Sequence, residues 1–348
     1  MQNVMLKYSS VFDSVESLDS EATEVDLTLT AMIEQWPDIH GIKDVGFYAF
    51  GLDSPSRRAR GKRLRSVLCS VVNQRVGGDR ALGLRLAAAW EMFHQLAIVH
   101  DDIEDGDEYR RGRPSVWKRF GVPQAINIGD YLYSTAIRET LDLRRRGAPS
   151  DVVLEILDLM AETAVRTAEG QALDLSMRQR RDVSVEDYFS CVRRKTGDYL
   201  IAPAVSAARI GGAGPRVIES LRQFGDLVGP AFQIGDDLID LTLGKGRDRV
   251  GSDIREGKRS LVVILASQRC SENERARLFD VLDAPRESTT DAMVSELLDL
   301  FEDKNAIQSS QAELDRLLAS SIVVLREIPD QLTADLAALA RLLRRRSV

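Results

Sequence analysis

The sequence predicts an all-α protein: a single large helical bundle with a central active-site cavity. Proline is scarce, with 10 residues in a chain of 348. The alternation of apolar and polar residues that marks a strand is rare, whereas runs rich in Ala, Leu, Glu and Arg dominate. Most of these runs are apolar over more than a narrow stripe, which is typical of helices in the middle of a large bundle.

Composition favours one folded domain over residues 1–348, and it leaves the order of residues 1–20 open. The chain is 44% hydrophobic and 29% charged, and it has no low-complexity linker or solenoid repeat. The net charge of −7 does not favour nucleic-acid binding. No signal peptide or membrane span is expected. Cys69, Cys191 and Cys270 are odd in number and far apart, which favours a reducing, cytoplasmic location.

The helices can be placed in order from caps, apolar spacing and breakers. The first is expected to begin near Ser20, and the second near Lys62 after a polar loop. The others are expected at about 78–105, 123–145, 150–178, 184–210 and 214–244, and again from Ser260 to the end of the chain. Two of these long helices, 78–105 and 214–244, end in a group of carboxylates.

The carboxylates of these two helices share one spacing. Asp101 and Asp105 lie four residues apart, so a helix places them on one face with about 5–6 Å between their Cβ atoms, and Asp102 lies beside that face. The second helix repeats the spacing with three further aspartates: Asp236, Asp237 and Asp240. Each group follows an apolar run, so water is expected to be limited around it.

Carboxylates this close repel one another unless a cation joins them. Mg²⁺ takes one or two carboxylates, keeps waters and completes its shell with substrate phosphates. Two facing clusters would therefore clamp a diphosphate through several Mg²⁺ ions. The alternative is a pair of solvated acidic helix ends. Zinc is not favoured, because no Cys or His pair has ligand spacing. His100 is expected to support the aspartates from behind or to be a packing group, and not to be a ligand.

Basic residues stand near both clusters, as a phosphate substrate requires. Arg110 and Arg111 follow the first cluster directly, whereas glycine-containing loops carry the others: Lys62, Arg65, Lys195, Arg247, Arg249 and Lys258. Any one of them alone would be read as a surface residue. The C-terminal "RLLRRR" is expected to interact with its own helix dipole, with phosphate binding as the alternative.

In this ordered set the sequence resembles the trans-isoprenyl diphosphate synthases, the polyprenyl synthase family of farnesyl and geranylgeranyl diphosphate synthases. The resemblance runs from about Gly61 to Lys258 through "GKRLR", "HQLAIVHDDIED", "RRGRPS", "NIGDYLYS", "EGQALDL", "RRKTG", "FQIGDDLIDL" and "GSDIREGKRS". The order of the motifs is far more specific than any one of them.

The resemblance implies a head-to-tail prenyltransferase, condensing isopentenyl diphosphate with dimethylallyl, geranyl or farnesyl diphosphate. About three Mg²⁺ ions per site are implied, with these carboxylate ligands: Asp101, Asp102, Asp105, Asp236 and Asp240. Asp237 would be a ligand or a supporting acceptor. The allylic diphosphate would contact Arg110, Lys195 and Lys258. Isopentenyl diphosphate would contact Lys62, Arg65, His94 and Arg111. Thr196 and Gln233 would face the allylic cation.

The sequence departs from the family at Arg249, where many relatives carry lysine. Glu104 and Asp107 are additional acids that are expected to face solvent.

Product length is expected to depend on side chains upstream of Asp101. Leu96 and Ala97 are not aromatic, so a fifteen-carbon stop is not expected there. Phe93, with Met92, is the expected floor for a product of about twenty carbons or longer, unless Phe93 is simply core. Tyr131 or Tyr133 could also set the floor.

Two rival functions remain: a class I terpene cyclase and a non-catalytic subunit of a heteromeric prenyl synthase. Both usually lack part of the two aspartate clusters that this chain retains. A homodimer is implied by the family. The sequence leaves open the primer, the pathway and the exact product.

Overall fold

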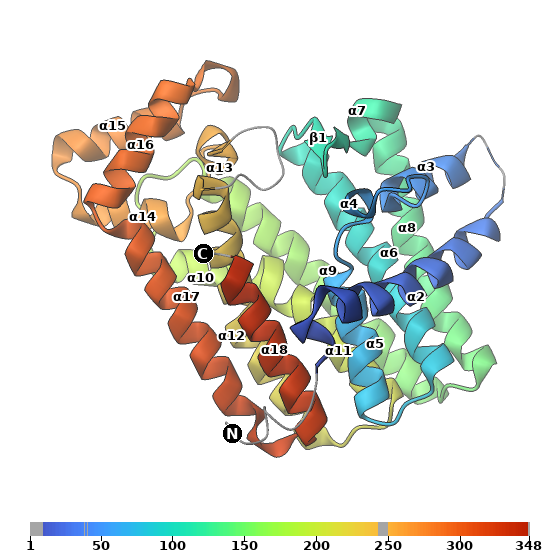
Figure 1. The fold of residues 1–348 in the computed structure, drawn as a ribbon. Coiled ribbons are helices and arrows are strands. Elements are labelled where there is room, and N and C mark those ends of the chain that lie inside the picture. Colours follow the sequence, from blue (N-terminus) through green and yellow to red (C-terminus); the bar gives the residue numbers. More distant parts are fainter. Residues whose placement is uncertain (1–9, 38, 40, 243–249, 347–348) are drawn as a thin grey trace. The chain divides into compact units, whose positions relative to one another are not determined.

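The computed structural model describes residues 10–346 apart from residues 38, 40 and 243–249 (Figure 1). These residues are almost entirely helical, which confirms the all-α prediction. The strands among them are β1 (Tyr109–Arg110) and β2 (Arg113–Pro114), which pair antiparallel. None of the described helices combines the length and the apolar character that a membrane crossing needs.

The chain groups into two compact units. The first contains Met1–Ala161, Ile201–Leu221 and Glu327–Ala338, and the second contains Glu162–Leu200, Arg222–Arg326 and Leu339–Val348. The five boundaries fall inside α9 (Ser150–Met177), α11 (Asp198–Ile210), α12 (Pro215–Thr242), η5 (Val324–Glu327) and α18 (Asp330–Arg346). The single domain and its central cavity stay predictions.

The first unit is built around α6 (Arg80–Glu104). Its other elements are η1 (Val11–Asp13), α2 (Val15–Glu34), α3 (Ile42–Phe50), α4 (Arg57–Arg60), α5 (Leu64–Arg75), α7 (Val116–Phe120), α8 (Val122–Asp142) and η2 (Leu143–Arg146). Helix α6 packs against α2, α5 and α8 (Figure 1). Its residues 86–93 are buried without a break, so α6 is a core helix on all sides, as its apolar sequence predicts.

Helix α2 begins at Val15, five residues before the expected start at Ser20. Ser14 caps it, because its hydroxyl accepts the N–H of Ser17. Residues 10–20 are thus folded, and residues 1–9 lie outside the described residues. Ser20 has the hydroxyl of an N-cap residue, but Ser14 has the same group and lies six residues earlier.

The second unit places α14 (Leu261–Arg269) against α10 (Val185–Val192), α16 (Asp291–Asp303) and α17 (Ala306–Val323). Its remaining elements are α13 (Ser252–Arg255), α15 (Glu272–Leu282), η4 (Arg286–Ser288) and η5 (Val324–Glu327). Helix α10 starts with a capping box, in which Ser184 and Asp187 satisfy each other's backbone N–H groups.

A π-helical turn, η3 (Arg193–Gly197), interrupts the expected helix 184–210. Such turns leave backbone groups and side chains in unusual directions and occur frequently at functional sites. Here the turn carries Lys195 and Thr196, two of the predicted site residues.

Candidate active site

The first acidic cluster lies at the C-terminal end of α6. Asp101 and Asp102 occupy its last turns, and Asp105 is the C-cap. The negative end of the helix dipole lies here, and no basic residue occupies the last turn, so the helix itself disfavours these charges. The Asp101 side chain is 31% exposed, whereas Asp102 is buried. An external cation can therefore reach the cluster at Asp101.

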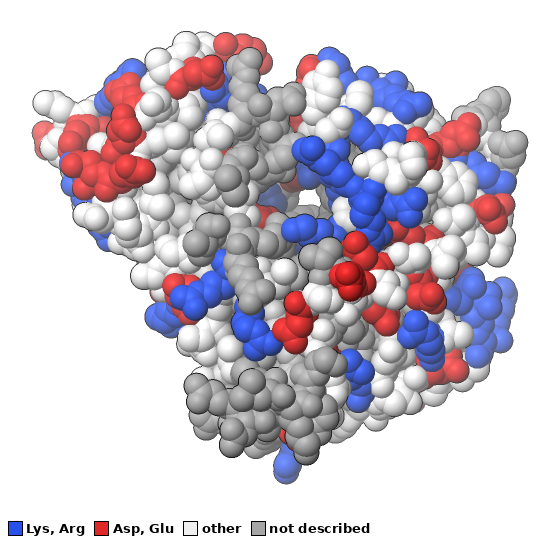
Figure 2. Space-filling model, viewed as in Figure 1, with Lys and Arg blue, Asp and Glu red and all other residues white. Residues whose placement is uncertain are grey.

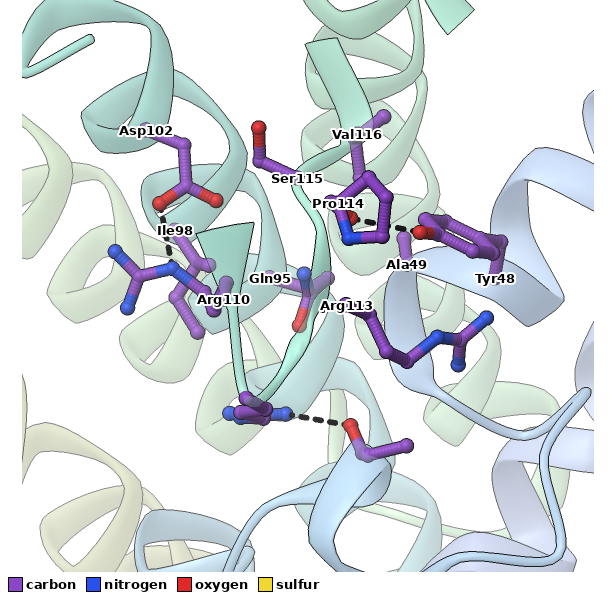
Figure 3. Close-up of a pocket in the computed structure, with 12 residues that line it drawn as sticks. Tyr48, Ala49, Gln95, Ile98, Asp102, Arg110, Arg113, Pro114, Ser115 and Val116 are labelled. Atoms are coloured by element: carbon purple, nitrogen blue, oxygen red, sulfur yellow. Dashed lines mark hydrogen bonds and ion pairs between the residues drawn. The ribbon is translucent and has the colours of Figure 1, made fainter. Parts of the chain in front are cut away.

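The β1–β2 hairpin brings Arg110 to this cluster. Its two turn residues, Arg111 and Gly112, have φ values of 55° and 75°, the left-handed pair that a tight hairpin turn needs. The Arg110 Nε atom donates to Asp102 at 2.5 Å (Figure 3). Arg110 Nη2 also lies 3.8 Å from Asp101. The arginine predicted to bind phosphate thus already contacts the predicted metal ligands.

Burial raises the pKa of Asp102 to about 7, although Arg110 opposes the shift. Asp107 and Asp101 add to the rise through their negative charges. A divalent cation at this group would stabilise the ionised carboxylates. The oxygen donors of the first cluster therefore fit Mg²⁺, a hard cation.

Asp107 does not face solvent as expected, because it is only 3% exposed. Its N–H donates to the carbonyl of Asp102, and its own carbonyl accepts the Trp117 indole N–H at 3.0 Å. These bonds turn its carboxylate inward, 3.8 Å from Arg110 Nη2. Glu104 is exposed as expected. The His100 ring packs against Gly129 of α8.

A second group of cations in the first unit suits a diphosphate without metal. Arg65 Nη1 and His94 Nε2 lie 3.4 Å apart. Arg111 donates to the carbonyls of Ala59 and Arg60, and its guanidinium lies where a side chain at Gly61 would clash. The predicted residues Arg65, His94 and Arg111 are therefore associated, and Lys62 is exposed nearby in sequence.

The electrostatics of this group favour an anion. Burial, followed by the charges of Arg65 and Arg111, lowers the pKa of His94 well below its ordinary value, so the ring is neutral. Burial and the charge of Arg63 also lower the pKa of Arg111, to about 10. These positive charges repel one another, and a phosphate group would relieve that repulsion.

Sequence reasoning missed the role of Arg63, which is completely buried. Its guanidinium donates to Asp26 at 2.8 Å, to Glu91 at 2.9 Å and to the Phe50 carbonyl at 2.7 Å. Its φ of 50° is in the left-handed region, which is uncommon for a residue with a side chain. Arg63 thus anchors the "GKRLR" loop from inside, leaving Lys62 exposed.

A cavity of about 30 Å³ lies behind the hairpin, lined by Gln95, Asp102, Arg110 and Ser115 among others (Figure 3). This volume matches a single water molecule, not a prenyl diphosphate. Farther along α6, Phe93 is buried against Trp90 and Tyr133, with ring centroids 5.4 and 5.8 Å away. Tyr131 instead contacts Trp36, so Tyr133 is the tyrosine beside the predicted floor.

In the second unit, α12 places Gln233 and Asp237 one turn apart. Three side chains donate to the Asp237 carboxylate: Gln233 and Lys258 to Oδ1, both at 2.8 Å, and Tyr188 to Oδ2 at 3.0 Å. Lys258 also contacts Asp253 at 3.2 Å. Burial lowers the pKa of Lys258, but the charges of Asp237, Asp253 and Asp174 outweigh it and raise that pKa well above its ordinary value.

Asp174 is a further buried carboxylate beside the predicted site residues, and the sequence names it only within "EGQALDL". It accepts Lys195 Nζ at 2.9 Å and Arg178 at 3.3 Å. Burial raises its pKa, but the charges of Lys195, Lys258 and Arg178 outweigh burial and hold the pKa at about 2. Lys195 is therefore held by a carboxylate that is ionised at neutral pH.

Two glycines allow the π-helical turn to approach its neighbours. A Cβ atom at Gly170 would lie 2.4 Å from Lys195 N, and one at Gly229 would lie 2.2 Å from the Gly197 Cα. Gly170 lies four residues before Asp174, which accepts a hydrogen bond from Lys195 of the turn. Gly229 lies four residues before Gln233, which accepts a hydrogen bond from Thr196 of the turn at 3.0 Å. This spacing is a signal that could have identified Asp174.

The remaining aspartates of the second cluster differ in burial. Asp240 is fully buried and accepts the N–H of Asp253, whereas Asp236 is half-buried. Across the described part of the chain, no three His, Cys, Asp or Glu side chains form a group that could hold a metal ion by themselves. Mg²⁺ in either unit would therefore need oxygens from water or substrate, as it commonly does.

Two of the predicted basic residues, Arg247 and Arg249, lie outside the residues that the structure describes. At the C-terminus, Arg344 forms an ion pair with Asp315 at 2.8 Å.

On the first unit, Lys and Arg side chains gather over α4, α7 and the hairpin (Figure 2).

Carboxylates suited to a hard cation, together with basic groups suited to phosphate on an all-α scaffold, are the features that a diphosphate-binding protein needs. The family model of polyprenyl synthetases matches residues 55–301. A short chain isoprenyl diphosphate synthase of Methanothermobacter thermautotrophicus is 38% identical over 259 residues, which cover 73% of this chain and 76% of that relative. The chain belongs to the polyprenyl synthetase family, and it is a prenyltransferase.

Other relatives agree in fold and length. The geranylgeranyl diphosphate synthase of Saccharolobus solfataricus is 33% identical over 279 residues, which cover 78% of this chain and 81% of the relative. The solved geranylgeranyl pyrophosphate synthetase of Pyrococcus horikoshii has a TM-score of 0.80 at 28% identity, covering 99% of this chain and 98% of that one.

Proposed function

We propose that the protein joins isopentenyl diphosphate head-to-tail to an allylic diphosphate and forms a trans-prenyl diphosphate of about twenty carbons or longer. The single observation that carries this proposal is the pair of basic groups: Arg110 donates to the carboxylates of the first cluster, and Arg65 lies 3.4 Å from His94. Curated relatives named as geranylgeranyl and geranylfarnesyl diphosphate synthases support the product size.

The allylic diphosphate is assigned to the groups that combine carboxylates with cations. Asp101, Asp102 and Asp105 of the first unit, and Asp236 and Asp240 of the second, would hold Mg²⁺. When bound, Mg²⁺ supplies positive charge that stabilises the departing diphosphate. Arg110, Lys195 and Lys258 would donate to the phosphate oxygens, which weakens the allylic C–O bond toward ionisation.

Isopentenyl diphosphate is assigned to Lys62, Arg65, His94 and Arg111. The resemblance to the family implies that this substrate carries no metal of its own. Thr196 and Gln233 would present oxygen atoms to the allylic cation. The double bond of isopentenyl diphosphate attacks that cation, a carbon–carbon bond forms, and a proton passes to the released diphosphate. The apolar residues of α6 would keep water from the cation.

The product floor is assigned to Phe93 with Tyr133. Replacement Phe93→Ala should open space below the first cluster and lengthen the product by one or more isoprene units. Tyr131→Ala is the matched control, because Tyr131 contacts Trp36 instead. Unchanged chain length in Phe93→Ala would remove Phe93 from this role.

We also propose a homodimer in the cytoplasm. Val122 and Ile126, one turn apart on α8, are 39% and 45% exposed, which supports a contact with a second copy. The three cysteines are free, which fits a reducing compartment. Ile126→Glu should shift the mass measured by light scattering from dimer to monomer; an unchanged mass would place any contact elsewhere.

The decisive experiment incubates the purified chain with labelled isopentenyl diphosphate, Mg²⁺ and one primer at a time: dimethylallyl, geranyl or farnesyl diphosphate. Products are dephosphorylated and sized by chromatography. Linear alcohols of about twenty carbons or more are expected. Cyclic hydrocarbons would indicate a cyclase, and no incorporation by the folded chain would indicate a subunit that needs a partner.

A further inference from the structure

Tyr188 has no part in the mechanism above, yet its hydroxyl contacts the second cluster. It lies on α10, is 2% exposed, and donates to Asp237 Oδ2 at 3.0 Å. Asp237 lies 49 residues away on α12 and is equally buried. A phenol and a carboxylate buried together in a well-formed hydrogen bond constrain each other more strongly than exposed groups do.

We propose that Tyr188 is a positioning residue for the reaction: it fixes the Asp237 carboxylate, and through it the directions of Lys258, Gln233 and Thr196. The inference rests on the proposed function, which assigns Lys258 to the allylic diphosphate and Thr196 to the allylic cation. Tyr188 itself touches neither substrate.

The directions follow from donor and acceptor chemistry. Asp237 accepts with both oxygens, so the Gln233 NH₂ group must point toward it. The other end of the Gln233 amide, Oε1, then points toward Thr196. The Thr196 hydroxyl must donate to that oxygen, which leaves its lone pairs for another partner. Lone pairs are the electron-rich part of a hydroxyl, and they suit a developing carbocation.

Without the Tyr188 hydroxyl, the Asp237 carboxylate could rotate, and the hydrogen bonds that orient Gln233 and Thr196 would no longer be fixed. Its Oδ1 atom already receives both Gln233 and Lys258, so Oδ2 would become the better acceptor for one of them. The Gln233 amide would then turn with the carboxylate, its Oε1 atom would move away from Thr196, and the Thr196 hydroxyl could turn its proton toward the substrate.

Local contacts hold the helix around Tyr188 in place. The capping box at Ser184 starts its helix, and the Phe189 ring packs edge-on at 5.6 Å. The π-helical turn with Lys195 and Thr196 follows directly. Tyr188 therefore ties the helix before the turn to the helix that carries the acidic motif.

The test is Tyr188→Phe, which keeps the ring and removes only the oxygen. We expect kcat to fall about tenfold and the dissociation constant for inorganic diphosphate with Mg²⁺ to rise several-fold. The KM for isopentenyl diphosphate should stay within about twofold, because its contacts belong to the first unit. Cys191→Ala is the matched control: Cys191 is buried on the same helix but donates to the Gly170 carbonyl. It should retain kcat.

Two further variants separate positioning from mere packing. The loss in Tyr188→Phe with Thr196→Ala should be smaller than the product of the two single losses, since both act through one chain. In a protein with 4-aminophenylalanine at the Tyr188 position, the N–H donor should restore kcat. If Tyr188→Phe fails to fold, this variant must be folded and active.

Wild-type kcat and diphosphate affinity in Tyr188→Phe, or fully multiplicative losses, would overturn the inference. Failure of the proposed function looks different: the wild-type chain would incorporate no isopentenyl diphosphate with any primer. In that case calorimetry still tests the role of Tyr188, because it compares diphosphate binding by the wild type and by Tyr188→Phe. Equal affinities would contradict the positioning role.

Discussion

The two aspartate clusters have the same spacing at the ends of two helices, but their surroundings differ. In the first, Arg110 is the principal cation, and Asp101 is still 31% exposed. In the second, the middle aspartate, Asp237, receives three donors and is buried. One motif thus serves two purposes: the first cluster is suited to an incoming cation, whereas the centre of the second holds protein side chains in place.

The largest effect that tests this difference is expected from Asp101→Asn. Loss of this accessible carboxylate should reduce kcat/KM about 1000-fold, because charge at the departing diphosphate is no longer stabilised. The free energy of unfolding should hardly change, since Asp101 is partly exposed. Steady-state kinetics and urea unfolding measure the two quantities.

Glu104→Gln is the matched control for Asp101→Asn. It removes one negative charge from an exposed position of the same motif, and wild-type kinetics are expected. Equal losses in both variants would mean that net charge near α6, and not the position of Asp101, governs activity.

The next effect belongs to Asp174→Asn in the second unit, where stability should fall together with activity. The pKa of Asp174 is lowered from 3.8 to about 2, so its ionised form stabilises the fold by about 2 kcal/mol above pH 4. A depressed pKa means that this stabilisation is present above the unfolded pKa and is lost as the pH falls toward 2. Urea midpoints across this pH range should converge for wild type and variant; parallel curves would contradict the assignment.

A smaller effect is expected from ligand removal. Mg²⁺ with inorganic diphosphate should raise the melting temperature by several degrees at about 100 times the dissociation constant. A chelator should reverse the rise, and Asp101→Asn should weaken it more than Glu104→Gln does. A rise that survives the chelator would show that the protein's cations alone bind diphosphate.

The smallest effect is expected from Asp107→Asn. Asp107 lies 3.8 Å from Arg110 and contributes to the raised pKa of Asp102. Its neutralisation should lower the pKa of Asp102 and change the KM for the allylic primer about two- to fivefold, with little change in kcat. Activity profiles between pH 5 and 8 provide the measurement, and an unchanged profile would separate Asp107 from the site.

The sequence by itself determined the helical class, the placement of both acidic clusters at helix ends and the family. These properties depend on local spacing: Asp101 and Asp105, or Gln233 and Asp237, share a helix face wherever the helix packs. The sequence also predicted which residues of "GKRLR" and of "RRKTG" belong together, because they lie within a few positions of one another.

Only the tertiary structure decided which charges are buried and which partners they meet. The sequence predicts that Asp107 faces solvent, but its backbone carbonyl accepts the indole N–H of a tryptophan ten residues away and its side chain is buried. Asp174 meets Lys195 across 21 residues, and Tyr188 meets Asp237 across 49. Burial and long-range contacts change the free energy of a charge by several kcal/mol. Because neither can be read from local spacing, the sequence named the clusters but could not assign different tasks to them.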